Sequence, residues 1–490
     1  MAEELRPEGI PVTVGEVVIT TPGLTGEVEV HAPGTPGMRG EEQATEDFRQ
    51  ALDDAGMAEQ LSVVVSRHQE VTPGEGTRGS GGGDDIVVNV PAPGEGNGQV
   101  LLYAAEDGSL SWHLADDVPP TAAPDRGGER RTYRIPRAVV PVDEREPAET
   151  RGILGAIGKK VLKVLVFPLV DPILGKVGDH FAKRWEAKNR LNRVRWMTVD
   201  GYRSSVADPF TDADWATLRE GRTLVLVHGT FSTPHGGFGS LPKATMTALH
   251  AAYGGRVVAF EHHSVSVTPG ENADFLAGLV PDGAALEVDL VTHSRGGLVG
   301  REIAGSSGAG ALTVTGLVMV ASPNAGTVLA DREHLSDLLD RITDLAQFVP
   351  DNGVTETIGL VLAVLKQLAV GAVGGLDGIM AMNPSEDYLE KLNARPAPDA
   401  ALRAVAADYE PPRGAPLARV ARDGATDLVF KAVDNDLVVP TGGCWDVEDA
   451  PGFPVDERLV LDQSSSVDHN SYFRQPEVSE RLLEWLPSAG

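Results

Sequence analysis

The sequence predicts an α/β domain that is preceded by a β-rich domain, and three observations carry this prediction. Residues 288–303 read as a buried strand, a sharp turn centred on Ser294, and a helix. Residues 223–232 form a second apolar run that leads into a glycine-rich loop. Residues 9–145 instead hold short strand-like runs separated by Gly- and Pro-rich turns, which is typical of an all-β domain.

Ser294 lies where the expected strand turns abruptly into the expected helix. The stretch THSRG at 292–296 matches the pattern G-x-S-x-G except at Thr292, where the pattern has a small glycine. A serine on such a turn projects its hydroxyl above the sheet edge, beside the backbone N–H groups that begin the helix. Serines in ordinary strand-to-helix loops also show S-x-G, so the prediction of a nucleophile depends on the companions of Ser294.

The first companion is His228-Gly229-Thr230, directly after the apolar run that begins at residue 223. A glycine-rich loop at this point lets the backbone approach a substrate oxygen without a clash from a Cβ atom. His228 precedes Ser294 in the chain, whereas a histidine that activates the serine is expected to come last. We therefore expect His228 to brace its loop. His262 and His263 match no role and are expected in a surface loop.

The other companions are an acid and a later histidine. Asp434 and Asp436 follow a strand expected at 428–433, and His469 precedes a final helix expected at 478–485. The chain order Ser, Asp, His is one of the orders in which such a triad occurs. Asp436 is the preferred acid and Asp434 is the alternative.

Over residues 201–490 the chain resembles the lipase and esterase branch of the α/β-hydrolase superfamily. The resemblance is carried by HGT, HSRGG, GLVMVASPNAGT, NDLVVP and DHNSYF, which fall in the family's order. It implies an α/β-hydrolase fold.

The resemblance also implies a role for each matching residue. Ser294 would be the nucleophile, His469 the general base and later the general acid, and Asp436 the carboxylate that orients the imidazole. The backbone N–H groups of Thr230 and Arg295 would form the oxyanion hole.

The implied activity is hydrolysis of a small-molecule or lipid-like carboxylic ester through an acyl-enzyme, with no metal and no organic cofactor. Two alternatives stay open. The same triad serves amidases, thioesterases and phospholipases, because this fold carries many chemistries. The chain can also be an interaction protein in which the hydrolase domain is a scaffold.

Composition narrows the surroundings in which the protein works. The formal net charge is −29, which argues against nonspecific binding to nucleic acid. Cys444 is the single cysteine, so an intramolecular disulfide is impossible. Residues 1–12 show neither a basic nor an apolar signal region, so we expect a cytoplasmic protein, with a peripheral position at a membrane as the alternative.

The N-terminal domain, 1–149, is expected to be a β-sandwich or a partly open barrel, with one short helix at 46–55. No group of acids, histidines or serines in it reads as a catalytic site. We expect a binding module for a partner that the sequence does not identify.

Residues 150–200 hold eleven Lys and Arg against four Asp and Glu, a net charge of +7 in an acidic chain. Apolar residues at 154, 157, 161 and 165 predict a basic helical connector to the hydrolase domain at 201–490. Its basic face can meet the acidic domains or an anionic membrane surface. A helical cap is expected as an insertion at about 331–426, with helices at 357–376 and 382–394.

Overall fold

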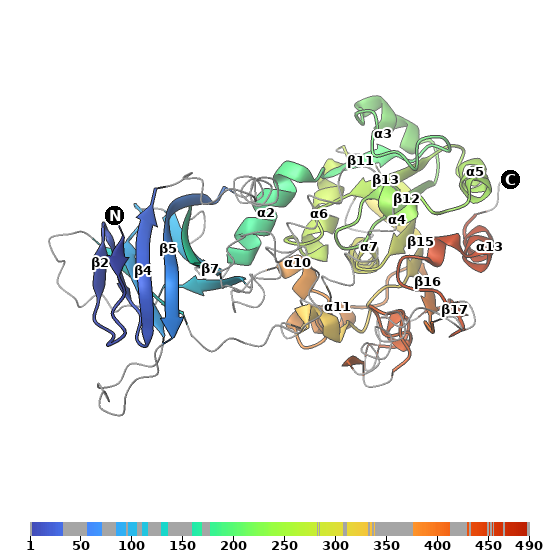
Figure 1. Ribbon diagram of the computed structural model, residues 1–490. Coiled ribbons are helices and arrows are strands. Elements are labelled where there is room, and N and C mark those ends of the chain that lie inside the picture. The colour runs from blue at the N-terminus through green and yellow to red at the C-terminus, as the bar shows by residue number, and fades with distance from the viewer. Residues whose placement is uncertain are drawn as a thin grey trace. The chain divides into compact units, whose positions relative to one another are not determined.

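The computed structural model forms two compact units (Figure 1). The first holds the described residues up to Arg184, and the second begins at Trp185, so the boundary falls within helix α2 (Val177–Asn189). The described residues are 2–32, 56–70, 85–94, 97–104, 110–115, 129–135, 159–168, 177–281, 283, 285–306, 311–331, 334–335, 338, 376–411, 429–430, 433–447, 450, 453, 455–463 and 466–487.

The N-terminal unit is a sandwich of two antiparallel sheets. The six-stranded sheet has the order β1 (Glu3–Glu4), β4 (Leu24–His31), β5 (Ala58–Glu70), β10 (Lys159–Pro168), β7 (Asn97–Ala104), β8 (Leu110–Leu114). The four-stranded sheet has the order β2 (Val12–Val14), β3 (Val17–Thr20), β6 (Ile86–Pro91), β9 (Arg130–Ile135). Val17 and Val88 of one sheet pack in a single core with Val63 and Leu101 of the other, which confirms the all-β prediction.

The helical connector predicted at 150–200 is wrong for its middle part. Lys159–Pro168 form β10, which pairs antiparallel with β5 on one side and β7 on the other. The segment is rich in valine, and β-branched residues favour strands. Pairing on both edges outweighs the helical spacing of its apolar residues, so the predicted amphipathic helix is excluded over 159–168. Peripheral membrane contact through 150–200 stays a prediction, and no described helix is both long and apolar enough to cross a bilayer.

The second unit is built on a seven-stranded sheet. Its order is β11 (Arg193–Trp196), β13 (Val257–Glu261), β12 (Thr223–Val227), β14 (Leu286–His293), β15 (Leu312–Val320), β16 (Ala401–Ala407), β17 (Glu457–Leu461). β11 is antiparallel to β13 and the remaining neighbours are parallel. Because parallel strands share one direction, the loops that follow β12, β14 and β15 leave the same edge of the sheet.

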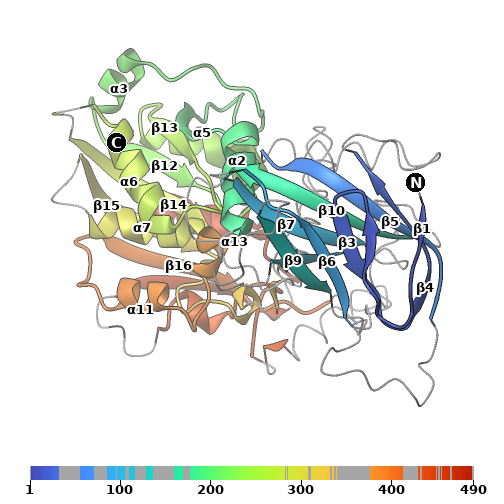
Figure 2. The ribbon, with the colours of Figure 1, turned by 90° about the vertical axis from the view of Figure 1, so that its left-hand side faces the viewer.

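Helices cover both faces of this sheet, as Figure 2 shows. Leu224 and Leu226 of β12 pack in a core with α5 (Lys243–Ala252) and α13 (Pro476–Trp485). Val225 and Val227 point the other way, into a core with α6 (Pro269–Leu279) and α7 (Gly296–Gly305). This alternation along a fully buried strand is expected for a parallel sheet between two helical layers. The fold is that of the α/β-hydrolases, as predicted. Short helices α3 (Asp212–Leu218) and α4 (Pro234–Phe238) flank β12 in the sequence.

The strand predicted immediately before the acid is wrong. In the described residues of 428–433 there is no strand. The strand that pairs with β15 on the side away from β14 is β16, which lies earlier in the chain and inside the predicted cap of 331–426. β16 reads ALRAVAA, and alanine has little preference for strands. Its place depends on parallel pairing with β15 and β17, which local composition does not reveal.

The predicted cap is therefore interrupted by the central sheet. In the described stretch 376–400, helices α10 (Asp377–Met380) and α11 (Asp387–Asn393) precede β16. The second corresponds to the helix expected at 382–394. The apolar run 357–376, except Leu376, and the helix expected at 46–55 lie outside the described residues.

The position of β10 in the centre of its sheet can be tested with proline. Val164 lies opposite Leu61 of β5 and Leu101 of β7. Val164→Pro should lower the unfolding temperature of the sandwich, because proline cannot donate the backbone hydrogen bond that a central strand needs. Hydrogen exchange should show lost protection in both neighbouring strands. Unchanged protection of β5 and β7 in this variant would contradict the assignment.

Candidate active site

Ser294 occupies a left-handed backbone conformation between β14 and α7. Its φ is +55°, which a residue with a side chain adopts at some cost and which recurs at functional sites. Its N–H donates to the carbonyl of Val320 at the end of β15, 2.8 Å away. The chain thus leaves the strand, turns at the serine and enters the helix within two residues, which is the geometry of a nucleophile elbow.

Two glycines let the elbow close. A Cβ atom on Gly296 would overlap the backbone oxygens of Val227 and His228, so the start of α7 lies directly against the end of β12. A Cβ atom on Gly229 would lie 2.7 Å from Cβ of Ser294. The backbone of the loop after β12 therefore runs alongside Ser294.

Thr292 is accommodated because the helix makes room for it. Thr292 is fully buried, and its hydroxyl donates to the carbonyl of Val318 over 3.2 Å. A Cβ atom on Gly300, in the second turn of α7, would lie 2.9 Å from the methyl carbon of Thr292 and 2.8 Å from Leu317. The glycine that the pattern lacks on the strand is thus replaced by one on the helix.

A chain of hydrogen bonds joins Ser294, His469 and Asp436. The hydroxyl oxygen of Ser294 lies 2.9 Å from Nε2 of His469, and Nδ1 of His469 lies 2.8 Å from Oδ2 of Asp436. All three side chains are buried. The structure thus brings together the three predicted residues, which lie on three loops that are far apart in the sequence. Asp434 is exposed, and no described contact joins its side chain to His469.

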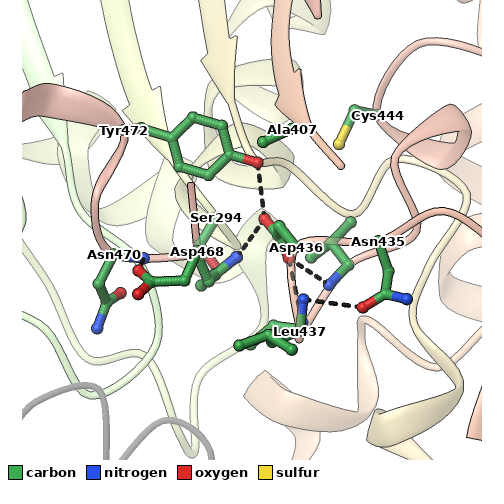
Figure 3. A network of polar contacts seen from close by, with 12 residues as sticks. Ser294, Ala407, Asn435, Asp436, Leu437, Cys444, Asp468, Asn470 and Tyr472 are labelled. Carbon is green, nitrogen blue, oxygen red and sulfur yellow. Dashed lines mark hydrogen bonds and ion pairs between the residues drawn. The ribbon is translucent and has the colours of Figure 1, made fainter. Parts of the chain in front are cut away.

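The carboxylate of Asp436 is held by further donors, which Figure 3 shows. The hydroxyl of Tyr472 donates to Oδ2 over 2.9 Å, and the N–H groups of Val438 and Val439 donate to Oδ1 over 3.1 and 2.8 Å. Burial raises the pKa of this carboxyl, but His469 and these hydrogen bonds together outweigh it, so the net shift of the pKa is downward. Asp436 is therefore an anion beside the imidazole.

His293, the residue before the serine, contacts both the backbone and the ring of His469. Its Nε2 lies 2.8 Å from the carbonyl oxygen of His469, and the two ring centroids are 5.1 Å apart. Burial lowers the pKa of His293 to about 3, so the ring is neutral and its Nε2 donates to that carbonyl. Sequence reasoning missed His293 and Tyr472. Their only signal was their position inside the two quoted motifs.

The two residues predicted to form an oxyanion hole flank the serine. Thr230 follows Gly229 on the loop beside Ser294, and Arg295 is the N-cap residue of α7. The guanidinium of Arg295 is fully buried and donates to the carbonyls of Gly378 and Val267 and to the side chain of Asn272. Its side chain is thus engaged in holding neighbouring segments, and its backbone N–H is the group that lies next to the nucleophile in the chain.

A model of one protein family matches residues 189–487, under the description "Domain of unknown function (DUF7379)". The chain belongs to this family. No curated protein matches the chain. The match covers the sheet, the elbow and the final helix, and the family's description assigns no activity.

Solved structures of several bacterial proteins are similar to the chain. A mature lipase from Bacillus licheniformis is 14% identical, over 54% of this chain and 91% of its own, with a TM-score of 0.33. Lipase 1 from Pelosinus fermentans is 16% identical, over 54% and 98%, with a TM-score of 0.39. EstA from Clostridium botulinum is 12% identical, over 60% and 98%, with a TM-score of 0.37.

His228 braces its loop, as predicted. Its Nδ1 lies 2.9 Å from the carbonyl oxygen of Gly229, and its Nε2 accepts the N–H of His262 over 3.2 Å. The expectation that His262 lies in a surface loop is wrong, because it is buried and stacks on His228 with 4.1 Å between ring centroids. His263 is half-buried. The ring of His262 is buried because it stacks on His228 and Phe260, at the ends of two neighbouring strands. Sequence alone does not show these contacts.

The pairing of Thr292 with Gly300 predicts non-additive effects on stability. Gly300→Ala should lower the free energy of unfolding by about 1–3 kcal/mol, the usual cost of overpacking. In the background of Thr292→Gly the same change should cost less, because the methyl group that it meets is gone. A denaturation cycle of the four proteins measures the coupling. Strictly additive effects would show that Thr292 and Gly300 do not compete for space.

Three buried histidines predict a stability that depends on pH. Burial lowers the pKa of His228 and His293 to about 3 and that of His262 well below its usual value. The unfolded chain binds protons on these rings near pH 6.5 and the folded chain does not. Stability is therefore fully present above about pH 7 and falls as pH drops from about 6.5 toward 3.

Chemical denaturation across this range measures the slope, with His262→Phe as the comparison. Phenylalanine keeps a ring between His228 and Phe260 but cannot titrate. The slope should decrease by up to about 1.4 kcal/mol per pH unit. An identical slope in the two proteins would mean that His262 is protonated in the folded state.

Proposed function

We propose that the protein is a serine hydrolase that cleaves carboxylic esters, including lipid-like esters, through a Ser294–His469–Asp436 triad. The observation that supports this most is the continuous hydrogen-bond chain from the buried anion of Asp436 through His469 to the hydroxyl of Ser294. The elbow presents that hydroxyl at the sheet edge where loops after parallel strands meet. These are the relations by which such a triad is recognised.

The proposed reaction begins with attack of the Ser294 oxygen on the ester carbonyl. Nε2 of His469 takes the serine proton, and the anion of Asp436 stabilises the imidazolium that results. The backbone N–H groups of Thr230 and Arg295 would bind the oxygen that becomes negative. The intermediate then collapses, and His469 returns the proton to the leaving alcohol. Water, activated by the same histidine, releases the acid and restores Ser294.

The first prediction of this proposal concerns the nucleophile. Ser294→Ala should reduce turnover of p-nitrophenyl esters by about four orders of magnitude or more, because the group that attacks the carbonyl is lost. Circular dichroism of the variant checks the fold. A series of acyl chain lengths, with matched amides and thioesters, defines the preferred bond. Turnover like that of the parent in the folded variant would rule out the mechanism.

The second prediction separates the two candidate acids. Asp436→Asn should cost about a thousandfold or more in kcat, because the imidazole loses the anion that orients and stabilises it. Asp434→Asn is the matched control, because Asp434 lies two residues earlier and is exposed, and this variant should stay within about threefold of the parent. Steady-state kinetics of the two variants decide. A larger loss at Asp434 would transfer the role to that residue.

A further inference from the structure

Phe231, which follows Thr230, is hydrogen-bonded through both its N–H and its carbonyl group. Phe231 has a φ of +55°, so the loop turns sharply directly after the predicted oxyanion donor. The N–H of Phe231 donates to the hydroxyl oxygen of Ser264 over 3.0 Å. Its carbonyl accepts a hydrogen bond from the guanidinium of Arg190 over 3.3 Å. Both polar groups of one residue are thus fixed by side chains from elsewhere in the chain.

Ser264 is itself fixed by a buried carboxylate. Glu186 of α2 is 1% exposed, and its two oxygens accept the N–H groups of Ser264, Val265 and Ser266 over 2.7, 3.0 and 3.0 Å. The hydroxyl of Ser266 donates to the same carboxylate over 2.7 Å. A buried carboxylate is costly unless donors satisfy it, and four donors do so here. Hydrogen bonds to an anion are strong, so the segment 264–266 has little freedom to move.

Arg190 comes from the same stretch of chain as Glu186, four residues later. It packs over the ring of Trp185 at 5.3 Å. Burial lowers the pKa of Arg190, and the negative charges of Glu186 and Glu261 offset this only in part. One short stretch around the end of α2 therefore holds the oxyanion loop twice, directly through Arg190 and indirectly through Glu186 and Ser264.

Such a loop needs this support for a physical reason. A donor N–H lowers the barrier only when it is already aimed at the place where the oxyanion forms. A misplacement of about 1 Å can cost a hundredfold in rate. The N–H of Thr230 belongs to a loop with a left-handed residue next to it, and that conformation has to be imposed by neighbours.

We propose that Ser264 and Arg190 are positioning residues that hold the Thr230–Phe231 backbone in its oxyanion-binding geometry, with Glu186 fixing Ser264. This inference rests on the proposed ester hydrolysis. It assigns a function to residues that neither touch the substrate nor belong to the triad.

The test compares Ser264→Ala with Thr315→Val. Each variant removes one buried or half-buried hydroxyl, but Thr315 donates to Asp289 in the first half of β15, away from the elbow. Ser264→Ala should lower kcat by about tenfold or more with KM changed less than about twofold, because the oxyanion contact matters only in the tetrahedral state. Thr315→Val should keep kcat within about twofold.

A second readout uses an alkyl trifluoromethyl ketone, which forms a tetrahedral adduct with the serine. In Ser264→Ala the inhibition constant of this ketone should rise by the same factor by which kcat/KM falls. Arg190→Met should give the same pattern, and it replaces Ser264→Ala if that variant does not fold. A general loss of structure would instead lower the concentration of active enzyme, without weakening the inhibitor.

Failure of this inference and failure of the proposed function give different results. If the parent protein hydrolyses esters and Ser294→Ala does not, the proposed function stands. Unchanged kcat and inhibitor affinity in both folded variants, Ser264→Ala and Arg190→Met, would then overturn the positioning role alone. A parent protein without ester hydrolysis would remove both.

Discussion

The left-handed backbone at Ser294 is the constraint on which the rest of the second unit depends. Ser294 has a φ of +55°. The strand β14 ends directly before it, and the helix α7 begins two residues after it. Such a turn is possible only where neighbouring backbone comes very close, which Gly296 and Gly229 allow. Buried strands on both sides and helices on both faces hold this conformation, which would be unfavourable in an isolated peptide.

The electrostatics of the site follow from the same burial. An anion at Asp436 is sustained by a tyrosine hydroxyl, two backbone N–H groups and His469. The other buried histidines, His228, His262 and His293, are neutral, because burial lowers the pKa of His228 and His293 to about 3 and that of His262 well below its usual value. They act as uncharged hydrogen-bonding groups around the site. In the proposed mechanism, His469 is then the single imidazole that exchanges a proton with Ser294.

The sequence was most informative where chemistry depends on short motifs in a fixed order. Ser294, Asp436 and His469 could be named because a serine elbow, an acid and a late histidine form a pattern that few other structures share. The residues that hold these three in place could not be named from the sequence. Glu186, Gly300 and Ser264 carry no motif, and their roles depend on contacts between segments far apart in the chain.

The two wrong elements have a common cause. Lys159–Pro168 has apolar residues at helical spacing, and β16 is rich in alanine, yet both are strands. Each lies between two other strands, and hydrogen bonds on both edges outweigh the helical spacing of the first segment and the low strand preference of alanine in the second. Pairing between distant segments is the information that a single sequence does not display.

The central claim is that Ser294 becomes covalently acylated during turnover. It is tested most directly by rapid acid quenching of the protein with a slowly deacylating ester, followed by peptide mapping by mass spectrometry. The account predicts an acyl group on the peptide that contains Ser294, which forms and decays at rates compatible with kcat. An acyl group on another residue, or ester turnover in which no acylated peptide ever forms, would contradict it.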